Sequence, residues 1–225
     1  MTELTKFLGL AFSAPLPLVN PLGDALVFVG LVGAAPVAVY RALARRIAIS
    51  TAIFLIAIEA GGTVVLNFFG ISLPVVQIAG GLALAAMGWS LLNQEEPSEK
   101  PDLPEIDART MQSLEKKVFY PFTFPITAGP GCIVVMVTLS AHASMKGMKG
   151  ILPAAMAHAG IAIAVVLLSL AVYICYGHAP TITSRIPAQS IHGILRLIAF
   201  VLLCIGVQIT SNGVEAIVKT MFAKT

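Results

Sequence analysis

Charged side chains are the component that this sequence has least of. Asp, Glu, Lys and Arg make up only 11% of its 225 residues, whereas a soluble domain carries about 25%. Four long runs hold almost none of them: Phe7 to Tyr40, Ile47 to Gln94, Val118 to Met145 and Ile151 to Ser184. This scarcity excludes a soluble globular domain.

Each of these runs is long enough to cross a bilayer, because about 20 helical residues span ~30 Å of hydrocarbon. The runs must be helical, since lipid offers peptide groups no hydrogen-bond partner. We therefore predict an all-α polytopic membrane protein surrounded by the lipid bilayer.

Motifs for catalysis, cofactor binding and nucleic acid binding are absent as well. The sequence has no HExxH, no GxSxG and no paired aspartates, so we expect no enzyme, no bound metal and no cofactor. Its cysteines, Cys132, Cys175 and Cys204, lie in apolar segments without a motif spacing, and we interpret them as structural thiols. The net charge of +3 comes from basic residues in short loops, which argues against binding of nucleic acid.

The N-terminal region resembles a signal peptide only at its start. Lys6 precedes an apolar stretch that contains the small residues Ala11 and Ser13. The apolar run continues to Tyr40, however, far beyond a signal core of about 7–15 residues. We expect this region to remain as the first span.

Turn and charge signals divide the chain into six expected spans, at residues 7–35, 47–69, 74–92, 118–142, 151–173 and 191–214. Lys and Arg are enriched on the cytoplasmic side of a membrane protein. With the N-terminus outside, nine of them face the cytoplasm and five do not, so we predict that both termini lie outside. The nine are Arg41, Arg45, Arg46, Lys100, Arg109, Lys116, Lys117, Arg185 and Arg196.

Three spans per half would place the two halves in the membrane upside down relative to each other. We predict a first repeat at residues 1–92, a charged cytoplasmic linker at 93–117 and a second repeat at 118–225. A shift of 109 positions sets Asn20-Pro21 against Gly129-Pro130. Inverted repeats of this kind place the substrate site at their interface near the midplane.

Proline and glycine interrupt the first and the fourth expected spans. Proline inside a helix costs ~3 kcal/mol, because it removes a backbone donor and clashes with the preceding turn. Two such breaks at corresponding places indicate that the freed peptide groups line a polar cavity between half-helices. The interrupting residues are Pro15, Pro17, Pro21 and Gly23 in the first span, and Pro121, Pro125, Gly129, Pro130 and Gly131 in the fourth.

These breaks define the predicted substrate site. A half-helix that restarts after Pro21 or Pro130 directs free N–H groups and its positive dipole end at the centre, which suits a carboxylate. The unwound carbonyls nearby suit an ammonium group or a cation, so a zwitterion would satisfy both. The predicted substrate-binding residues are Asn20, Pro21, Gly23, Asp24, Thr127, Ala128, Gly129, Pro130 and Gly131.

Two acidic residues lie inside expected spans, where an ionisable group costs at least ~2.5–3.5 kcal/mol. We expect Asp24 to be functional, the alternative being a structural pair or a helix cap. Glu59 is expected either to carry a proton or to remain a neutral, hydrogen-bonded acid. Asn67, Gln77 and Gln208 are candidates for coupling or for lining the cavity, and otherwise for polar contacts between helices.

Other residues in the spans receive a structural interpretation. His158 stands alone in the fifth span, and we expect it to be a packing residue. The hydroxyls of Ser13 and Thr127 are expected to recover hydrogen bonds lost at the breaks. The glycines at 61–62, 80–81 and 88 are expected to let helices approach closely.

Four stretches carry a resemblance to a known family: Asn-Pro-Leu-Gly-Asp at 20–24, Phe-Gly-Ile-Ser-Leu-Pro at 69–74, Gln-Ile-Ala-Gly-Gly at 77–81 and Pro-Phe-Thr-Phe-Pro-Ile-Thr-Ala-Gly-Pro-Gly at 121–131. Over nearly its whole length the chain resembles the MarC family of integral membrane proteins. The resemblance implies a multi-pass protein of the bacterial inner membrane. The family is close to the LysE-type exporters, and some of its members are described as small neutral amino acid transporters.

The first stretch departs from the family pattern, which reads roughly Asp-Pro-x-Gly-Asn-x-Pro-x-Phe. Here position 20 is Asn, position 24 is Asp, and Leu26 replaces the second proline. The carboxylate therefore lies four residues, or one helical turn, further along the same face. This change bears on which cation or amine is bound.

The sequence therefore predicts a transporter of a small polar or zwitterionic solute, such as a small neutral amino acid, that works by alternating access. Its partners would be that solute and a coupling ion, either a proton or sodium, and homo-oligomerisation is left open. A channel is an alternative. A membrane-embedded thiol redox carrier is disfavoured, because the counterpart of Cys132 is Gly23 and a single thiol cannot cycle a disulfide.

Overall fold

The computed structural model describes residues 2–33, 35–93, 114–143, 150–185 and 188–222, and its elements within these ranges are helices. This confirms the predicted all-α class. In chain order the elements are α1 (Glu3–Ser13), α2 (Leu16–Val19), α3 (Pro21–Val32), α4 (Val37–Phe68), α5 (Leu73–Leu92), the π-helical segment η1 (Val118–Thr127), α7 (Pro130–Ala143), α8 (Ile151–Gly177), α9 (Ala179–Arg185) and α10 (Ala188–Phe222).

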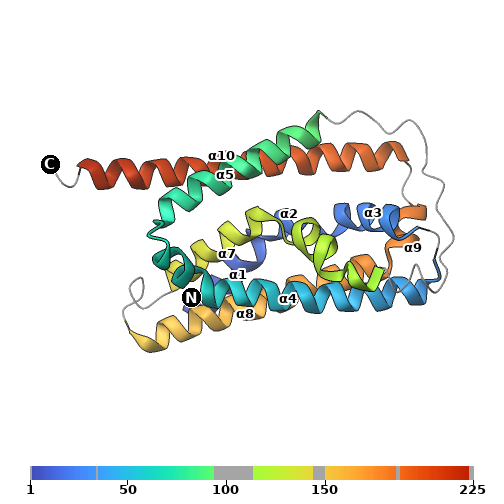
Figure 1. Cartoon of the computed structure of the whole chain (residues 1–225), viewed down its shortest axis with the longest axis horizontal. Helices are drawn as coiled ribbons and strands as arrows, with labels where there is room; N and C mark the ends of the chain where they lie inside the picture. The colour runs from blue at the N-terminus through green and yellow to red at the C-terminus, as the bar shows by residue number, and fades with distance from the viewer. Residues whose placement is uncertain (1, 34, 94–113, 144–149, 186–187, 223–225) are drawn as a thin grey trace.

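The long helices run side by side along the long axis of the molecule (Figure 1). Within the part of the chain that the structure describes, five stretches are long and apolar enough to cross a membrane, and the bent pair of η1 and α7 provides a sixth if it is counted as one span. The beginning of α1 and the end of α10 lie at the same end of the molecule, as six crossings require (Figure 1). Most of the predicted linker, residues 94–113, falls outside the described residues. The inverted relation of the halves stays a prediction.

The second span begins ten residues earlier than expected, at Val37 instead of position 47. Pro36 has an extended backbone and fixes the start of α4, and residues 37–60 contain no glycine or proline to break the helix. The buried hydroxyl of Tyr40 donates to the carbonyl of Gly33 at 2.7 Å, which ties the preceding turn to α4. Arg41 and its neighbours Arg45 and Arg46 therefore lie on a helix and not in a loop.

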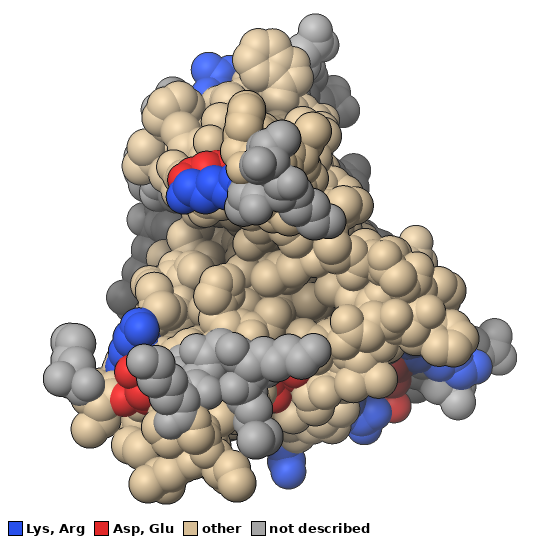
Figure 2. Space-filling view, turned by 90° about the vertical axis from the view of Figure 1, so that its left-hand side faces the viewer, with Lys and Arg blue, Asp and Glu red and all other residues tan. Residues whose placement is uncertain are grey.

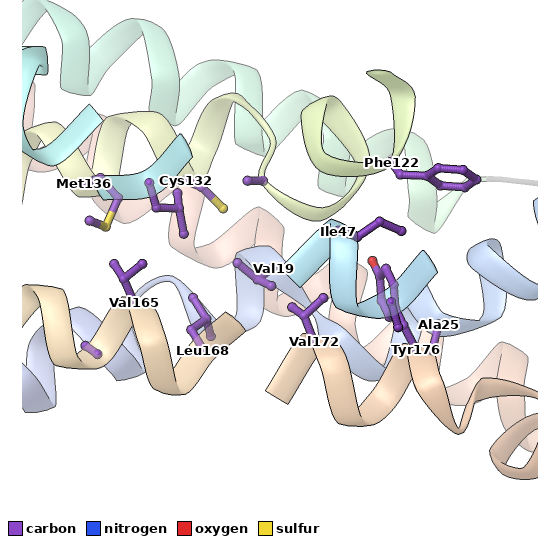
Figure 3. Packing of buried hydrophobic residues seen from close by; sticks show 14 of the residues in the cluster. Val19, Ala25, Ile47, Phe122, Cys132, Met136, Val165, Leu168, Val172 and Tyr176 are labelled. Carbon is purple, nitrogen blue, oxygen red and sulfur yellow. The ribbon is translucent and has the colours of Figure 1, made fainter. Parts of the chain in front are cut away.

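One part of the molecule, called the body below, consists of α1, α3, α4, η1, α7 and α8. Its core contains a cluster of aromatic rings around Phe28 of α3. The ring of Phe28 stacks on Tyr176 of α8 with centroids 4.8 Å apart, and it meets Tyr40 and Phe122 edge-on at 5.6 and 5.4 Å. Figure 3 shows side chains from several helices of the body converging on this core.

The other part is the pair of helices α5 and α10, which lie against each other along one side of the body (Figure 1). Their backbones touch through glycines. A Cβ atom added at Gly81 would lie 2.6 Å from the backbone nitrogen of Thr210, and one added at Gly213 would lie 2.7 Å from the carbonyl oxygen of Pro74. Contacts of successively higher residue number on α5 are made with successively lower residue numbers on α10, so the two helices are antiparallel.

Most of the glycines expected to permit close helix packing do so. A Cβ atom at Gly88 would lie 2.6 Å from the backbone nitrogen of Leu203, and one at Gly62 would clash with Val137 of α7. Gly80 and Gly81 serve two different neighbours, since Gly80 faces Val134 of α7 while its successor faces α10. The prediction was wrong for Gly61, which has open space where a side chain would be.

The surface is largely apolar, as a lipid-facing surface should be. Figure 2 shows the end of the molecule where the chain begins and finishes, with tan side chains over most of the face and blue and red ones mainly toward its rim. Large side chains such as Ile53, Val64 and Leu197 are each about two-thirds exposed, at 65%, 66% and 65%. In water such a surface would be costly, whereas in a bilayer it is favourable.

Candidate functional site

The first span is broken where the prolines and glycine predicted it. Helix α1 ends at Ser13, α2 provides one further turn, and α3 begins at Pro21. Between α2 and α3, Asn20 takes a left-handed backbone conformation with φ 40° and ψ 59°. Asparagine tolerates this conformation better than most residues, because its short side chain can form local hydrogen bonds. The break thus has a specific residue at its centre.

Asn20 also accepts hydrogen bonds from N–H groups at the start of α3, which were predicted to be free. Its side-chain oxygen accepts a hydrogen bond from the backbone nitrogen of Gly23 at 3.2 Å, and its carbonyl accepts one from the nitrogen of Asp24 at 2.9 Å. A side chain at position 23 would collide with the Asn20 amide, so glycine is required there. The start of α3 therefore has fewer free N–H groups for a carboxylate than the prolines suggested.

The second break lies between η1 and α7, whose axes differ by 72°. Within η1, Tyr120 and Phe124 have extended backbone, directly before Pro121 and Pro125. Proline disfavours the helical conformation in the residue before it, which explains both interruptions.

Threonine hydroxyls repair the carbonyls that this second break leaves free. The Thr127 hydroxyl donates to the carbonyl of Phe122 at 2.8 Å. Because its proton is used there, its oxygen accepts a hydrogen bond from the hydroxyl of Tyr176, also at 2.8 Å. Thr123 donates to the carbonyl of Val118 at 2.9 Å. The expected role of Thr127 is confirmed. Thr123 was missed, although a hydroxyl two residues after a proline in a span is a signal of the same kind.

The two breaks meet inside the body. The Asp24 carboxyl lies close enough to the thiol of Cys132 on α7 and to the hydroxyl of Tyr176 on α8 to interact electrostatically with both. Through Tyr176 it is linked to Thr127 of the second break. Ala128 and Cys132 are completely buried in the same core, and Figure 3 shows Cys132 on the side of α7 that faces Val19.

Asp24 has an unsatisfied oxygen at this meeting point. Its Oδ2 atom is buried and has no hydrogen-bond partner among the described residues. A buried carboxyl oxygen without a partner is costly, so its presence favours a role in binding. The remaining predicted residues, Gly129, Pro130 and Gly131, form the start of α7, and Gly131 packs against the side chain of Leu84. We call the region of residues 20–24 and 127–131 the polar centre.

A cavity of about 500 Å³ lies between the body and the α5–α10 pair. It adjoins the first break through Ser13 and Ala14, and Figure 2 shows the molecule hollowed between its upper and lower parts. Its polar lining is uncharged, and the Thr138 hydroxyl in it is buried without a partner among the described residues. The lining residues are Leu10, Ser13, Ala14, Gln77, Val135, Thr138, Leu139, Ile205, Ile209 and Asn212.

The predicted cavity-lining residues have different locations. Gln77 lines this cavity. Gln208 does not line it, but its amide donates to the side-chain oxygen of the lining residue Asn212 at 2.9 Å. Asn67 is exposed near the end of α4, where its carbonyl accepts from the nitrogen of Gly70 at 3.1 Å. Asn67 therefore belongs to neither the cavity nor the polar centre.

Glu59 has a partner that the sequence did not suggest. Its carboxyl oxygen contacts the Nδ1 atom of His158 on α8, and its backbone carbonyl accepts from the hydroxyl of Ser140 on α7 at 2.6 Å. The interpretation of His158 as an isolated packing residue was wrong. The missed signal was the presence of one acid and one base in two otherwise uncharged spans, since such groups usually pair.

Comparison with known proteins assigns the family. The model of the MarC family of integral membrane proteins matches residues 5–218. The chain belongs to the MarC family. The inner membrane protein MarC of Salmonella typhimurium is 30% identical over 226 residues, and that of Citrobacter koseri is 33% identical over 233 residues. Both alignments cover 98% of this chain and 99% of the relative.

The MarC relatives are named inner membrane proteins, and the apolar helices of this chain support the same multi-pass location. No solved structure matches the chain. In the first of the four stretches that carry the resemblance, Asn20 caps α3 and the Oδ2 atom of Asp24 is buried.

Proposed function

We propose that this MarC family protein is a carrier of a small polar or zwitterionic solute, for example a small neutral amino acid, and works by alternating access. The observation that supports this most is the buried carboxyl of Asp24 at the meeting point of two broken spans. Broken helices near the middle of a membrane protein are tolerated where they line a binding site.

The polar centre offers opposite charges to the two ends of a zwitterion. The free oxygen of Asp24 binds an ammonium group. The carboxylate of the solute lies at the start of α7, a 14-residue helix whose N-terminus carries a partial positive charge. The start of α3 contributes less, because Asn20 already occupies two of its N–H groups.

The cavity reaches the first break through Ser13 and Ala14, although none of its lining residues belongs to the polar centre, and in this proposal the solute passes from the cavity to that centre. Its uncharged hydroxyl and amide groups suit a solute without net charge, and its volume of about 500 Å³ lies within the range of small-molecule sites. Helices α5 and α10 form the outer wall of this cavity, and α1 and α7 of the body form its inner wall.

Counterflow in proteoliposomes with a panel of amino acids tests the proposal. Asp24→Asn removes the charge at nearly constant volume, and Gly129→Leu fills the second break. Each is expected to abolish exchange without loss of membrane insertion. If both variants exchange the solute like the wild type, the site is wrong, and an ohmic current without saturable exchange would identify a channel.

A double substitution provides a matched control. Asn20→Asp combined with Asp24→Asn restores the family order of these two residues while it keeps one acid and one amide. Because the side chains lie one turn apart, this variant is expected to insert normally and to exchange a different set of solutes. Unchanged selectivity would mean that the carboxyl position does not determine what is bound.

A further inference from the structure

The contact between Glu59 and His158 joins the two predicted halves of the protein. Glu59 lies on α4, the second span of the first half, and His158 lies on α8, the second span of the second half. We infer that this pair is the proton-binding site that couples transport to a proton gradient. The inference rests on the proposed function and identifies its coupling ion.

The two side chains of the pair differ in their exposure. The side chain of Glu59 is only 12% exposed, whereas that of His158 is 40% exposed. His158 lies two turns from the start of α8, roughly 10 Å along its axis, at the end of the molecule where the chain begins. In this proposal protons reach the buried acid through the more exposed histidine.

The chemistry of the pair fits a proton and not sodium. Sodium is a hard cation that requires several oxygen ligands. Here the carboxyl of Glu59 faces an imidazole nitrogen, and the Glu59 carbonyl is occupied by Ser140. The described residues also contain no group of three His, Cys, Asp or Glu side chains that could hold a metal ion.

Asp24 on α3 belongs to the polar centre, and the arginines of α4 lie roughly 20 Å or more from Glu59 along the helix. Titratable groups on α1 and α7 have partners of their own. On α1, which packs against α8, Lys6 Nζ lies 3.8 Å from Glu3 Oε2. On α7, the Nδ1 atom of His142 lies 2.7 Å from the carbonyl oxygen of Thr138. The proton is therefore held between Glu59 and His158.

One proton per cycle suffices for coupling. A carboxylate facing a neutral imidazole binds one proton and becomes a carboxylate–imidazolium ion pair, which holds α4 and α8 together. Loss of that proton removes the attraction between the charges. A relative movement of the halves that separates the two side chains therefore requires release of the proton, which ties protonation to the conformational change.

Solute accumulation driven by a proton gradient tests the inference. Wild-type proteoliposomes receive an inward gradient of one pH unit, with L-alanine, L-serine and L-threonine as probes and pyranine inside to follow protons. With one proton per solute, this gradient supports an accumulation ratio of up to about tenfold. Glu59→Gln and His158→Gln are expected to lower the ratio to one, while counterflow without a gradient continues. His142→Gln is the matched control and is expected to keep the full ratio.

The outcomes separate this inference from the proposed function. Counterflow by the wild type without accumulation in the gradient, or full accumulation by His158→Gln, would overturn the proton site and leave the carrier intact. Absence of counterflow with every probe would overturn the carrier, and the coupling site with it. If Glu59→Gln fails to elute as a monodisperse protein, His158→Gln and its proton signal from pyranine decide the question alone.

Discussion

Around Phe28 the helices of the body are held apart at the distance that aromatic rings require, whereas α5 and α10 approach until their backbones touch. Phe28 fills the space between α3, η1 and α8 with a ring that is 1% exposed. At Gly81 the neighbouring helix occupies the position that a side chain would take. In lipid, both arrangements depend on close packing, because apolar side chains gain little by leaving a hydrocarbon solvent. The core around Phe28 is therefore destabilised when side-chain atoms are removed, and the contact between α5 and α10 is destabilised when side-chain atoms are added.

The largest effect is expected from emptying the centre of the body. Phe28→Ala removes a ring that contacts three other rings, and the resulting cavity should lower the free energy of unfolding by about 3–5 kcal/mol. Unfolding in mixed detergent micelles measures this change. Phe200→Ala on α10 is the control, since that ring is 56% exposed and its loss should cost far less.

The second prediction fills the α5–α10 contact. Gly81→Leu adds a side chain where backbone atoms of α10 lie 2.6–2.7 Å from the new Cβ, and overpacking of this kind costs about 1–3 kcal/mol. The melting temperature in detergent should fall. Gly61→Leu has open space and should melt like the wild type. An equal fall of the melting temperature in both variants would show that Gly81 is no more tightly packed than Gly61.

The third prediction removes one hydrogen bond and leaves packing unchanged. Tyr176→Phe deletes the hydroxyl that lies 2.8 Å from Thr127, and a loss of about 1 kcal/mol is expected. Tyr120→Phe is the control, because its ring is 67% exposed. Equal stability of the two variants would mean that the hydrogen bond between Tyr176 and Thr127 does not contribute to the free energy of unfolding.

The smallest effect is expected at the polar surface of the body. Arg46 and Glu115 lie 3.1 Å apart, with side chains 54% and 35% exposed. Arg46→Ala should change the free energy of unfolding by less than about 1 kcal/mol, and the change should shrink further in high salt. A loss as large as that of Phe28→Ala would contradict the view that side-chain volume holds the body together.

The number of spans and both breaks could be predicted from the sequence, because they follow from rules that act within one segment. Charge-free runs determine where helices cross lipid, and prolines determine where they stop. The start of α4 was placed too late because Arg41 was taken as a sign of a loop, although arginine is a good helix former.

The partners across helices could not be predicted in the same way. That Asp24 keeps a free oxygen while Glu59 finds His158 depends on how α3, α4, α7 and α8 pack, and no spacing within one segment encodes it. The cap at Asn20 is different, since asparagine directly before a proline is a recognisable helix start. That signal was present in the sequence and was overlooked.

The length of α4 has a consequence for how the protein meets phospholipid headgroups. Its 32 residues extend roughly 48 Å, well beyond the ~30 Å thickness of the acyl-chain region. Arg41, Arg45 and Arg46 all lie within its first ten residues, so the helix fixes the directions of these three side chains relative to one another. Inserting a single alanine ahead of residue 41 would keep the helix, yet would rotate everything before it by about 100° relative to these arginines.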